Sequence, residues 1–225
     1  MTRHLERAVD DLKRRILEES ALVEESVQKS VKAIKERDAE LAKTVIDGDP
    51  ELDQMEVDIE EECQKVLALH QPVASDLRFI IAVLKINNDL ERIGDLAVNI
   101  AERAVYLAST ERVTMPFDFE GMAGKAQAML RNSLDALVNL NIELALKVLA
   151  ADDEVDAINR LMYNDVQEGI RQHPEHIGQL IHLLSVSRHL ERVADHATNI
   201  AEDVVYLIRG DIVRHRSEDF QEPAH

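Results

Sequence analysis

An internal repeat constrains this chain more than any other feature. Residues 188–207 match residues 88–107 at an offset of 100, with 12 of 20 positions identical. Upstream, residues 144–156 match residues 41–53 at an offset of 103. The same structural unit is therefore expected twice, and two such units can pack side by side within one chain.

Composition and apolar spacing favour helices over strands. The 225 residues include only 7 glycines, 5 prolines and 3% aromatic residues, whereas all-β folds need turn residues and β-branched or aromatic alternation. In the first segment, apolar residues recur at intervals of three, four and seven, as they do on a helix that covers a bundle core. These residues are Leu5, Val9, Leu12, Ile16, Val23, Val27, Val31, Ile34 and Leu41.

Prolines mark the expected helix boundaries. Asp49-Pro50 and Asp152 are interpreted as helix starts, because Asp can cap a helix and Pro fits its first turn. The helices then span about 3–47, 51–70, 74–112, 117–150, 153–172 and 175–209. The predicted fold class is all-α, with six helices in two tandem three-helix bundles. The expected units are 1–114 and 115–213, followed by a polar tail at 214–225.

Charge and hydropathy exclude several classes of function. With 26 basic and 44 acidic side chains, the net charge is −18, which disfavours general binding of nucleic acid or anionic lipid. The longest apolar run, 79–84, is too short for a membrane span, and the charged N-terminal residues do not resemble a signal peptide. The single cysteine, Cys63, excludes an internal disulfide and is expected to be a small packed residue. We therefore expect a soluble, cytoplasmic protein.

The repeated segment carries an acidic stripe on one helix face. In each copy, oxygen-bearing side chains fall within an arc of about 80°, opposite the apolar residues. They are Glu91, Asp95, Asn99 and Glu102 in the first copy, and Glu191, Asp195, Asn199 and Glu202 in the second. Like charges one turn apart repel by about 0.2–0.5 kcal/mol per pair, yet both copies keep the pattern. Such carboxylates can bind hard cations, iron or manganese. A site for metal or a cationic partner and an ordinary solvated face both remain open.

Hairpin geometry adds one acid to each stripe. The second and third helices of each unit are joined by a short turn and therefore run antiparallel. Counting residues from that turn places Asp53 level with the first stripe and Asp156 level with the second. Both are candidate metal ligands, although an acid in a first helical turn also complements the helix dipole.

The remaining patterns do not indicate catalysis. His182, His189 and His196 are spaced by seven but fall toward the apolar side, which favours half-buried bundle histidines over a ligand site or a pH-sensitive interface. The sequence contains no glycine-rich phosphate loop, no nucleophile paired with a base and no Cys/His zinc spacing. A ferritin-like oxidase would need inward-facing Glu-x-x-His pairs, whereas these stripes face away from the core. We therefore do not expect an enzyme.

Two strings carry a resemblance to a known family. They are QPVASDLRFIIAVLKINNDLERIGDLAVNIAE at 71–102 and RHLERVADHATNIAE at 188–202. At these residues the sequence resembles the PhoU family of phosphate-transport and phosphate-signalling regulators. The resemblance extends over nearly the whole chain. The resemblance implies a six-helix, pseudo-twofold protein that is commonly a dimer. It also implies multinuclear metal clusters at Glu91/Asp95 and Glu191/Asp195, with iron first and zinc, manganese, magnesium or nickel as alternatives.

The same resemblance implies a negative regulator that links two partners. These are the ATPase subunit of the high-affinity phosphate importer and a phosphate-sensing histidine kinase, so that the membrane is reached only through partners. His189 stands where the first copy has Asp89, so identical metal loading of the two sites is not implied. The alternative function is a metal-binding or storage bundle without a signalling role.

Overall fold

The fold is the all-α, six-helix architecture that the sequence predicts. The computed structural model describes residues 3–114 and 118–210, and these ranges contain no β-strand. Its helices are α1 (Arg3–Glu36), α2 (Ala39–His70), α3 (Ala74–Ala108), α4 (Phe119–Asn139), α5 (Ile142–Gln172) and α6 (Ile177–Arg209), with a short 3-10 helix, η1 (Pro174–His176), before α6. The expected tail at 214–225 and the expected unit boundary at Met115 lie outside the described residues.

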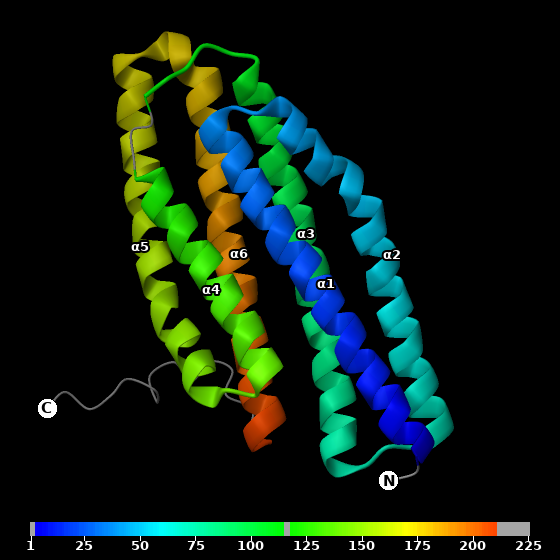
Figure 1. Ribbon diagram of the computed structural model, residues 1–225. Coiled ribbons are helices and arrows are strands. Elements are labelled where there is room, and N and C mark those ends of the chain that lie inside the picture. The colour runs from blue at the N-terminus through cyan, green and yellow to red at the C-terminus, as the bar shows by residue number, and fades with distance from the viewer. Residues whose placement is uncertain (1–2, 115–117, 211–225) are drawn as a thin grey trace, which may run out of the picture.

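Two three-helix bundles lie side by side. Helices α1, α2 and α3 pack together, as do α4, α5 and α6, and Figure 1 shows α2 and α5 at the outer edges of the pair. The bundles meet through α3 with α6 and through α1 with α4. The two repeated segments, which lie in α3 and α6, therefore face each other along the middle of the molecule.

The first helix boundary differs from the prediction. Helix α1 ends before Arg37, which adopts a left-handed conformation with φ 59°. Asp38 then caps α2 by accepting a hydrogen bond from the backbone amide of Leu41 at 2.9 Å. The prediction that Asp49-Pro50 starts a helix is wrong, because Pro50 lies inside α2. A proline removes one backbone donor and bends a helix, and α2 changes direction in its first half (Figure 1).

The second unit repeats this turn at the offset of 103. Leu140 is left-handed, with φ 48°, and the Asn141 side chain accepts a hydrogen bond from the Leu144 amide at 3.1 Å. The prediction that Asp152 starts a helix is therefore also wrong, since Asp152 lies well inside α5. In both units the left-handed residue and the capping side chain decide where the helix begins.

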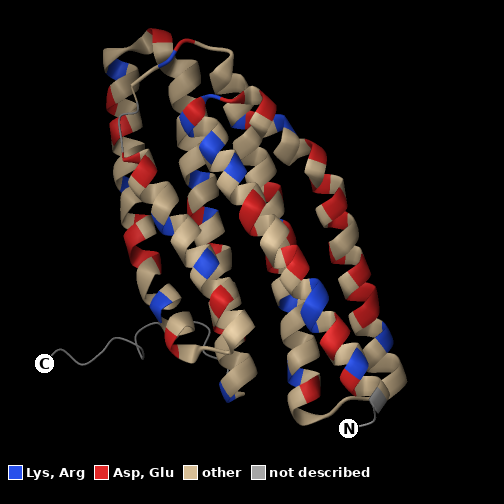
Figure 2. Ribbon diagram, viewed as in Figure 1, with Lys and Arg blue, Asp and Glu red and all other residues tan. Residues whose placement is uncertain are grey.

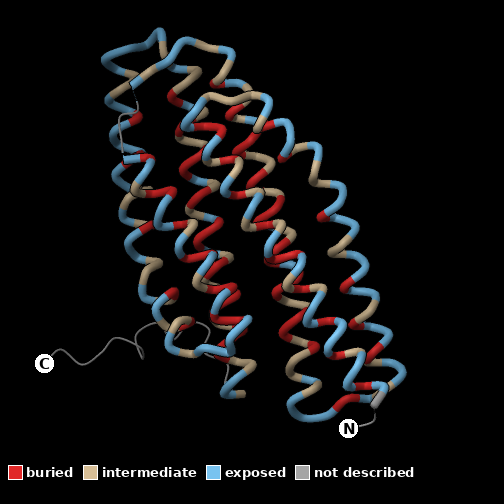
Figure 3. Tube along the Cα trace, viewed as in Figure 1, coloured by how far each residue is buried: buried red, intermediate tan, exposed pale blue. Residues whose placement is uncertain are grey.

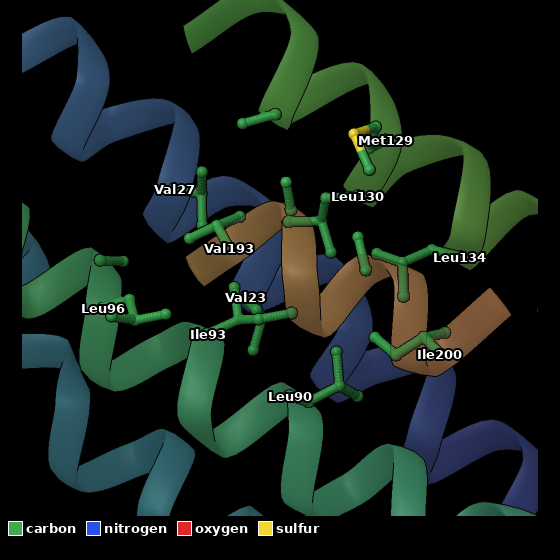
Figure 4. Close-up of a cluster of buried hydrophobic side chains, with 14 of the residues drawn as sticks. Val23, Val27, Leu90, Ile93, Leu96, Met129, Leu130, Leu134, Val193 and Ile200 are labelled. Carbon is green, nitrogen blue, oxygen red and sulfur yellow. The ribbon is translucent and has the colours of Figure 1, made fainter. Parts of the chain in front are cut away.

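One apolar core runs through both bundles. Figure 3 shows buried residues on the inner faces of the helices, and Figure 4 shows how the side chains meet. Val23 and Val27 of α1, Ile93 of α3, Leu130 of α4 and Val193 of α6 belong to one cluster and are fully buried. The apolar positions predicted opposite the acidic stripe of α3 are all buried. The two bundles therefore share their core instead of closing separately.

Acidic and basic residues recur along the helices of both bundles (Figure 2). None of the described helices is long and apolar enough to cross a membrane.

The single cysteine, Cys63 of α2, is buried. Burial, together with the charges of Glu62 and Glu60, raises the pKa of its thiol to about 12. Cys63 is therefore a packed, unreactive residue, as predicted.

Candidate metal centres

The first acidic cluster joins all three helices of the first bundle. It comprises Glu19 of α1, Asp49, Asp53 and Glu56 of α2, and Glu91 and Asp95 of α3. Partial burial raises the pKa of Glu91, and the neighbouring carboxylates, first of all Asp95, raise it further. Arg92 offsets part of this repulsion, since it lies 3.3 Å from Glu91 and 3.4 Å from Asp95. Carboxylates from separate helices thus repel one another across one small region.

Glu19 is the buried member of this cluster. Its side chain is 1% exposed, and its Oε2 atom has no hydrogen-bond partner in the described part of the chain. Burial, followed by the charges of Glu56 and Glu91, raises the pKa of Glu19 to about 8. The carboxyl group is therefore mostly protonated at neutral pH, and a cation held by the cluster would favour its ionised form.

The second acidic cluster joins α5 and α6. It comprises Asp152, Asp156, Glu191 and Asp195. Burial is the largest cause that raises the pKa of Asp152, Glu191 and Asp195, and repulsion among the four carboxylates adds to it. The Thr198 hydroxyl donates a hydrogen bond to Asp152 Oδ1 at 3.2 Å. The four acids stand at the repeat positions of Asp49, Asp53, Glu91 and Asp95, so the arrangement is duplicated.

The structure brings Asp53 and Asp156 to the stripe acids, at the level that hairpin geometry predicts. The Asp53 charge raises the pKa of Glu91, and the Asp156 charge raises the pKa of Glu191 and Asp195. This closeness follows from the antiparallel packing of α2 with α3 and of α5 with α6. That these acids bind metal stays a prediction.

The other stripe residues of the first copy make separate contacts. Asn99 Nδ2 donates a hydrogen bond to the backbone carbonyl of Asp95 at 2.7 Å. Glu102 is exposed, and its carboxylate lies 3.2 Å from Nη1 of Arg103. Glu102 therefore pairs with the adjacent Arg103 and is not a member of the first acidic cluster.

In the second copy, the equivalent residues face the interface between α3 and α6. Asn199 Nδ2 donates a hydrogen bond to Asp89 Oδ1 of α3 at 3.1 Å, and His196 Nδ1 lies 2.7 Å from the same oxygen. Glu202 lines an open cleft of about 710 Å³, hereafter the acidic cleft, together with Asp89 and Asp195. Asp89 thus belongs to the contact with the second bundle and not to the first acidic cluster.

Glu91 and Asp95 are less exposed than single-helix geometry predicts. The side chains of Glu91 and Asp95 are 25% and 43% exposed. The physical reason is that α2 packs along α3, and α5 along α6, so that each stripe lies beside a neighbouring helix. Half-burial increases the cost of unpaired negative charge and therefore the advantage of a bound cation.

Sequence reasoning missed the acids that α2 and α5 contribute besides Asp53 and Asp156. The signal was present, since Asp49, Asp53 and Glu56 follow helical spacing, and Asp152, Asp156 and Asn159 repeat it. The interpretation of Pro50 as a helix start hides this spacing, because it leaves Asp49 outside the helix. Glu19 has no such signal, because it is a single acid in α1 whose partners come from other helices.

The donor atoms of both clusters fit hard cations. Carboxylate oxygens are the ligands that magnesium and manganese prefer, and iron accepts them as well. The buried, unpaired oxygen of Glu19 is a further donor beside the first cluster. Among the described residues, only His173, Glu175 and His176 hold three ligand atoms within 4.8 Å of one another. In this structure neither acidic cluster therefore brings three ligand atoms within that distance of one another.

The three predicted bundle histidines lie half-buried along α6. His182 stacks on Tyr106 of α3 with ring centroids 3.8 Å apart. His189 Nε2 lies 3.1 Å from Ser185 Oγ, and His196 contacts Asp89 as described above. These contacts confirm the interpretation as half-buried, hydrogen-bonded or packed residues.

Comparison with known proteins identifies the family. The PhoU domain matches residues 16–104 and again residues 119–204. This chain belongs to the PhoU family. The phosphate-specific transport system accessory protein PhoU homolog of Aquifex aeolicus is 38% identical over 208 residues, which cover 92% of this chain and 94% of that protein. The PhoU homolog of Pseudomonas aeruginosa is 37% identical over 208 residues, 92% of this chain and 86% of that protein.

Solved PhoU structures share the fold. The crystal structure of PhoU from Pseudomonas aeruginosa has a TM-score of 0.89 at 36% identity and covers 92% of this chain and 99% of its own. PhoU from Streptococcus pneumoniae has a TM-score of 0.82 at 30% identity, with 93% and 99% coverage. In this chain each matched PhoU domain contains one acidic cluster.

Proposed function

We propose that this PhoU-family chain is an accessory protein of a phosphate importer and regulates phosphate uptake. One observation carries the proposal: relatives named as phosphate-specific transport system accessory proteins align with 92% of this chain. The two PhoU domains account for both bundles, so the alignment covers the complete repeated architecture.

In this proposal the protein acts in the cytoplasm as a negative regulator. It contacts the ATPase subunit of the importer and a phosphate-sensing histidine kinase, and it keeps the phosphate-starvation response off when phosphate is plentiful. It works by binding, without catalysis of its own, and it forms a homodimer. The family resemblance supports these partners, and light scattering tests the dimer, since a 25.4 kDa species alone at micromolar concentrations would argue against it.

We also propose that the two acidic clusters bind metal ions, with iron as the first candidate. Asp53, Glu91 and Asp95 would hold metal in the first cluster, and their equivalents Asp156, Glu191 and Asp195 in the second. A bound cation supplies positive charge that relieves carboxylate repulsion. The raised pKa values of Glu91 and Asp195 support this role, because burial and like charge both oppose ionisation there.

Metal analysis of purified protein tests the clusters separately. We expect Glu91→Ala/Asp95→Ala to lose the ions of the first cluster, and Glu191→Ala/Asp195→Ala those of the second, while circular dichroism stays helical. The control is Asp58→Ala/Glu61→Ala, which removes two exposed carboxylates of α2 outside the clusters. Equal metal content in all variants would reject the assignment.

A deletion strain that carries the phosphate importer tests regulation. We expect starvation genes to stay on in high phosphate, and we expect the wild-type chain to restore repression. Starvation genes that remain repressed in high phosphate without the protein would reject the regulatory proposal. A metal-binding or storage bundle without a signalling role would then be the better description, because metal content alone does not separate the two functions.

A further inference from the structure

A small pocket on α6 has a lining of opposite charge to the acidic clusters. It is open, measures about 380 Å³ and is lined by Ile181, Leu184, Ser185, Arg188, His189 and Arg192. We call it the basic pocket. Within the described residues, no Asp or Glu lines it. The net charge of the chain is −18, so a pocket lined by two arginines and no carboxylate differs in charge from most of the molecule.

Neither arginine of the basic pocket makes a short ion pair, although the charge of Arg188 lowers the pKa of Glu191 and that of Arg192 lowers the pKa of Asp195. In the described ranges, no carboxylate oxygen lies within 4.0 Å of the side-chain nitrogens of Arg188 or Arg192. Arg92, which stands at the repeat position of Arg192, is instead paired with Glu91 and Asp95 at 3.3 and 3.4 Å. Arg188 and Arg192 are one helical turn apart and repel each other, a cost that a bound anion would remove.

A third arginine approaches the pocket from α3. Arg103 Nε donates a hydrogen bond to Ser185 Oγ at 3.4 Å, and this oxygen lies 3.1 Å from His189 Nε2. Arg103 also pairs with Glu102, so it supports the pocket without offering a free guanidinium. The Ser185 hydroxyl is therefore held at the pocket by groups from both helices.

The basic pocket is the repeat counterpart of the acidic cleft. Positions 84, 85, 88 and 89 line the acidic cleft, and their equivalents 184, 185, 188 and 189 line the basic pocket. In the cleft these positions include Lys85, which is paired with Asp203 at 3.0 Å, and Asp89. In the pocket they carry Ser185, Arg188 and His189. At these four positions the cleft thus carries one lysine and one aspartate, whereas the pocket carries an arginine and a histidine and no acid.

We propose that the basic pocket binds inorganic phosphate, with the Arg188 and Arg192 guanidinium groups and the Ser185 hydroxyl as donors. Guanidinium groups pair with phosphate oxygens through two parallel hydrogen bonds, and a charge-assisted bond is about twice as strong as a neutral one. The choice of phosphate among small oxyanions rests on the proposed function. The pocket adjoins the second acidic cluster, but among the described residues its lining contains the two arginines and none of the four acids of that cluster.

NMR of the full chain labelled with ¹⁵N-arginine, in EDTA and at constant ionic strength, tests this site. We expect added inorganic phosphate to shift the Nε–Hε signals of Arg188 and Arg192 and to leave that of Arg92 in place. Arg188→Gln/Arg192→Gln should weaken phosphate binding about tenfold or more, as expected for the loss of charge-assisted hydrogen bonds. Arg92→Gln is the matched control, because it removes a paired arginine at the equivalent repeat position, and we expect it to leave the affinity unchanged.

Three results would overturn the assignment. They are equal phosphate affinity of the double variant and the wild type, equal shifts with sodium chloride or acetate, and binding that appears only when metal is restored. Each result would leave the regulatory proposal standing, because the deletion strain tests that proposal in cells. Conversely, starvation genes that stay repressed in that strain would reject the regulatory proposal, whereas the NMR titration would still decide whether the pocket binds phosphate.

Discussion

Burial determines the charge state of single residues in this protein, and Glu19 is the clearest case. At the offset of 103, Glu19 of the first unit corresponds to Met122 of the second, and both side chains are fully buried. Met122 fills the equivalent buried position with an apolar side chain that carries no charge. Glu19 instead places a carboxyl group against Glu56 and Glu91, where ionisation would cost both solvation and repulsion.

Replacing Glu19 should therefore change how stability depends on pH. The folded pKa of Glu19 is raised from 4.5 to about 8, so its contribution to stability is complete below about pH 4.5 and is lost as pH rises toward 8. We expect Glu19→Gln to match the wild type near pH 4.5. At pH 8–9 the variant should be more stable by on the order of 2–4 kcal/mol in metal-free buffer. Urea unfolding across this range, in EDTA, measures the difference.

Glu18→Gln is the control, because Glu18 is its exposed neighbour on α1. It should change stability by less than about 0.5 kcal/mol at every pH. A Glu19→Gln variant whose stability runs parallel to that of the wild type would show that Glu19 ionises normally in the folded protein.

At the scale of the helices, capping side chains decide where α2 and α5 begin. Asp38 and Asn141 occupy equivalent positions, and each accepts a hydrogen bond from the amide three residues on, at 2.9 and 3.1 Å. Each follows a left-handed residue that ends the preceding helix. The repeat therefore includes the turn between the first and second helices, which proline positions did not reveal.

Removing a cap should cost a small, measurable amount of stability. We expect Asp38→Ala to lower the free energy of unfolding by about 1 kcal/mol, and Asp38→Asn to retain most of it, because Asn can accept the same hydrogen bond. Asp47→Ala, an exposed position within α2, is the control. Urea midpoints at an unchanged slope provide the measurement. Equal losses at 38 and 47 would mean that the cap contributes nothing specific.

At the scale of the whole molecule, the shared core couples the two bundles. Side chains of α1, α3, α4 and α6 form one buried cluster, and α3 packs against α6 along the repeated segments (Figure 4). Separating the bundles would expose this apolar surface to water, which is unfavourable in proportion to its area. The chain is thus expected to unfold as a single unit despite its two matched domains.

A substitution in one bundle should therefore destabilise both. We expect Leu130→Ala in α4 to lower stability by about 2–5 kcal/mol, since the leucine is fully buried at the junction of the bundles. Calorimetry should show one transition before and after the change, at a lower temperature in the variant. Two resolved transitions, only one of them shifted, would show that the bundles unfold independently.

Much of the fold and part of the candidate site follow from sequence alone. The duplicated unit, the six helices, the apolar face of α3 and the pairing of Glu91 with Asp95 on one face are predictable, because periodicity and spacing are local properties of the chain. The position of Asp53 along its helix, beside Glu91 and Asp95 of the next helix, was predictable too, since a short turn makes two helices antiparallel neighbours. Proline was a poor guide to helix ends because a long, packed helix can absorb one as a bend.

The tertiary structure decided everything that depends on which helix covers which face. It placed Glu19 of α1 beside acids of α2 and α3, and it half-buried a stripe that an isolated helix leaves in water. It set Asp89 against α6, and it left Arg192 without a short ion pair although the equivalent Arg92 is paired. No local pattern encodes these outcomes, because the energies of burial and of charge pairing depend on neighbours that are distant in sequence and close only in the folded chain.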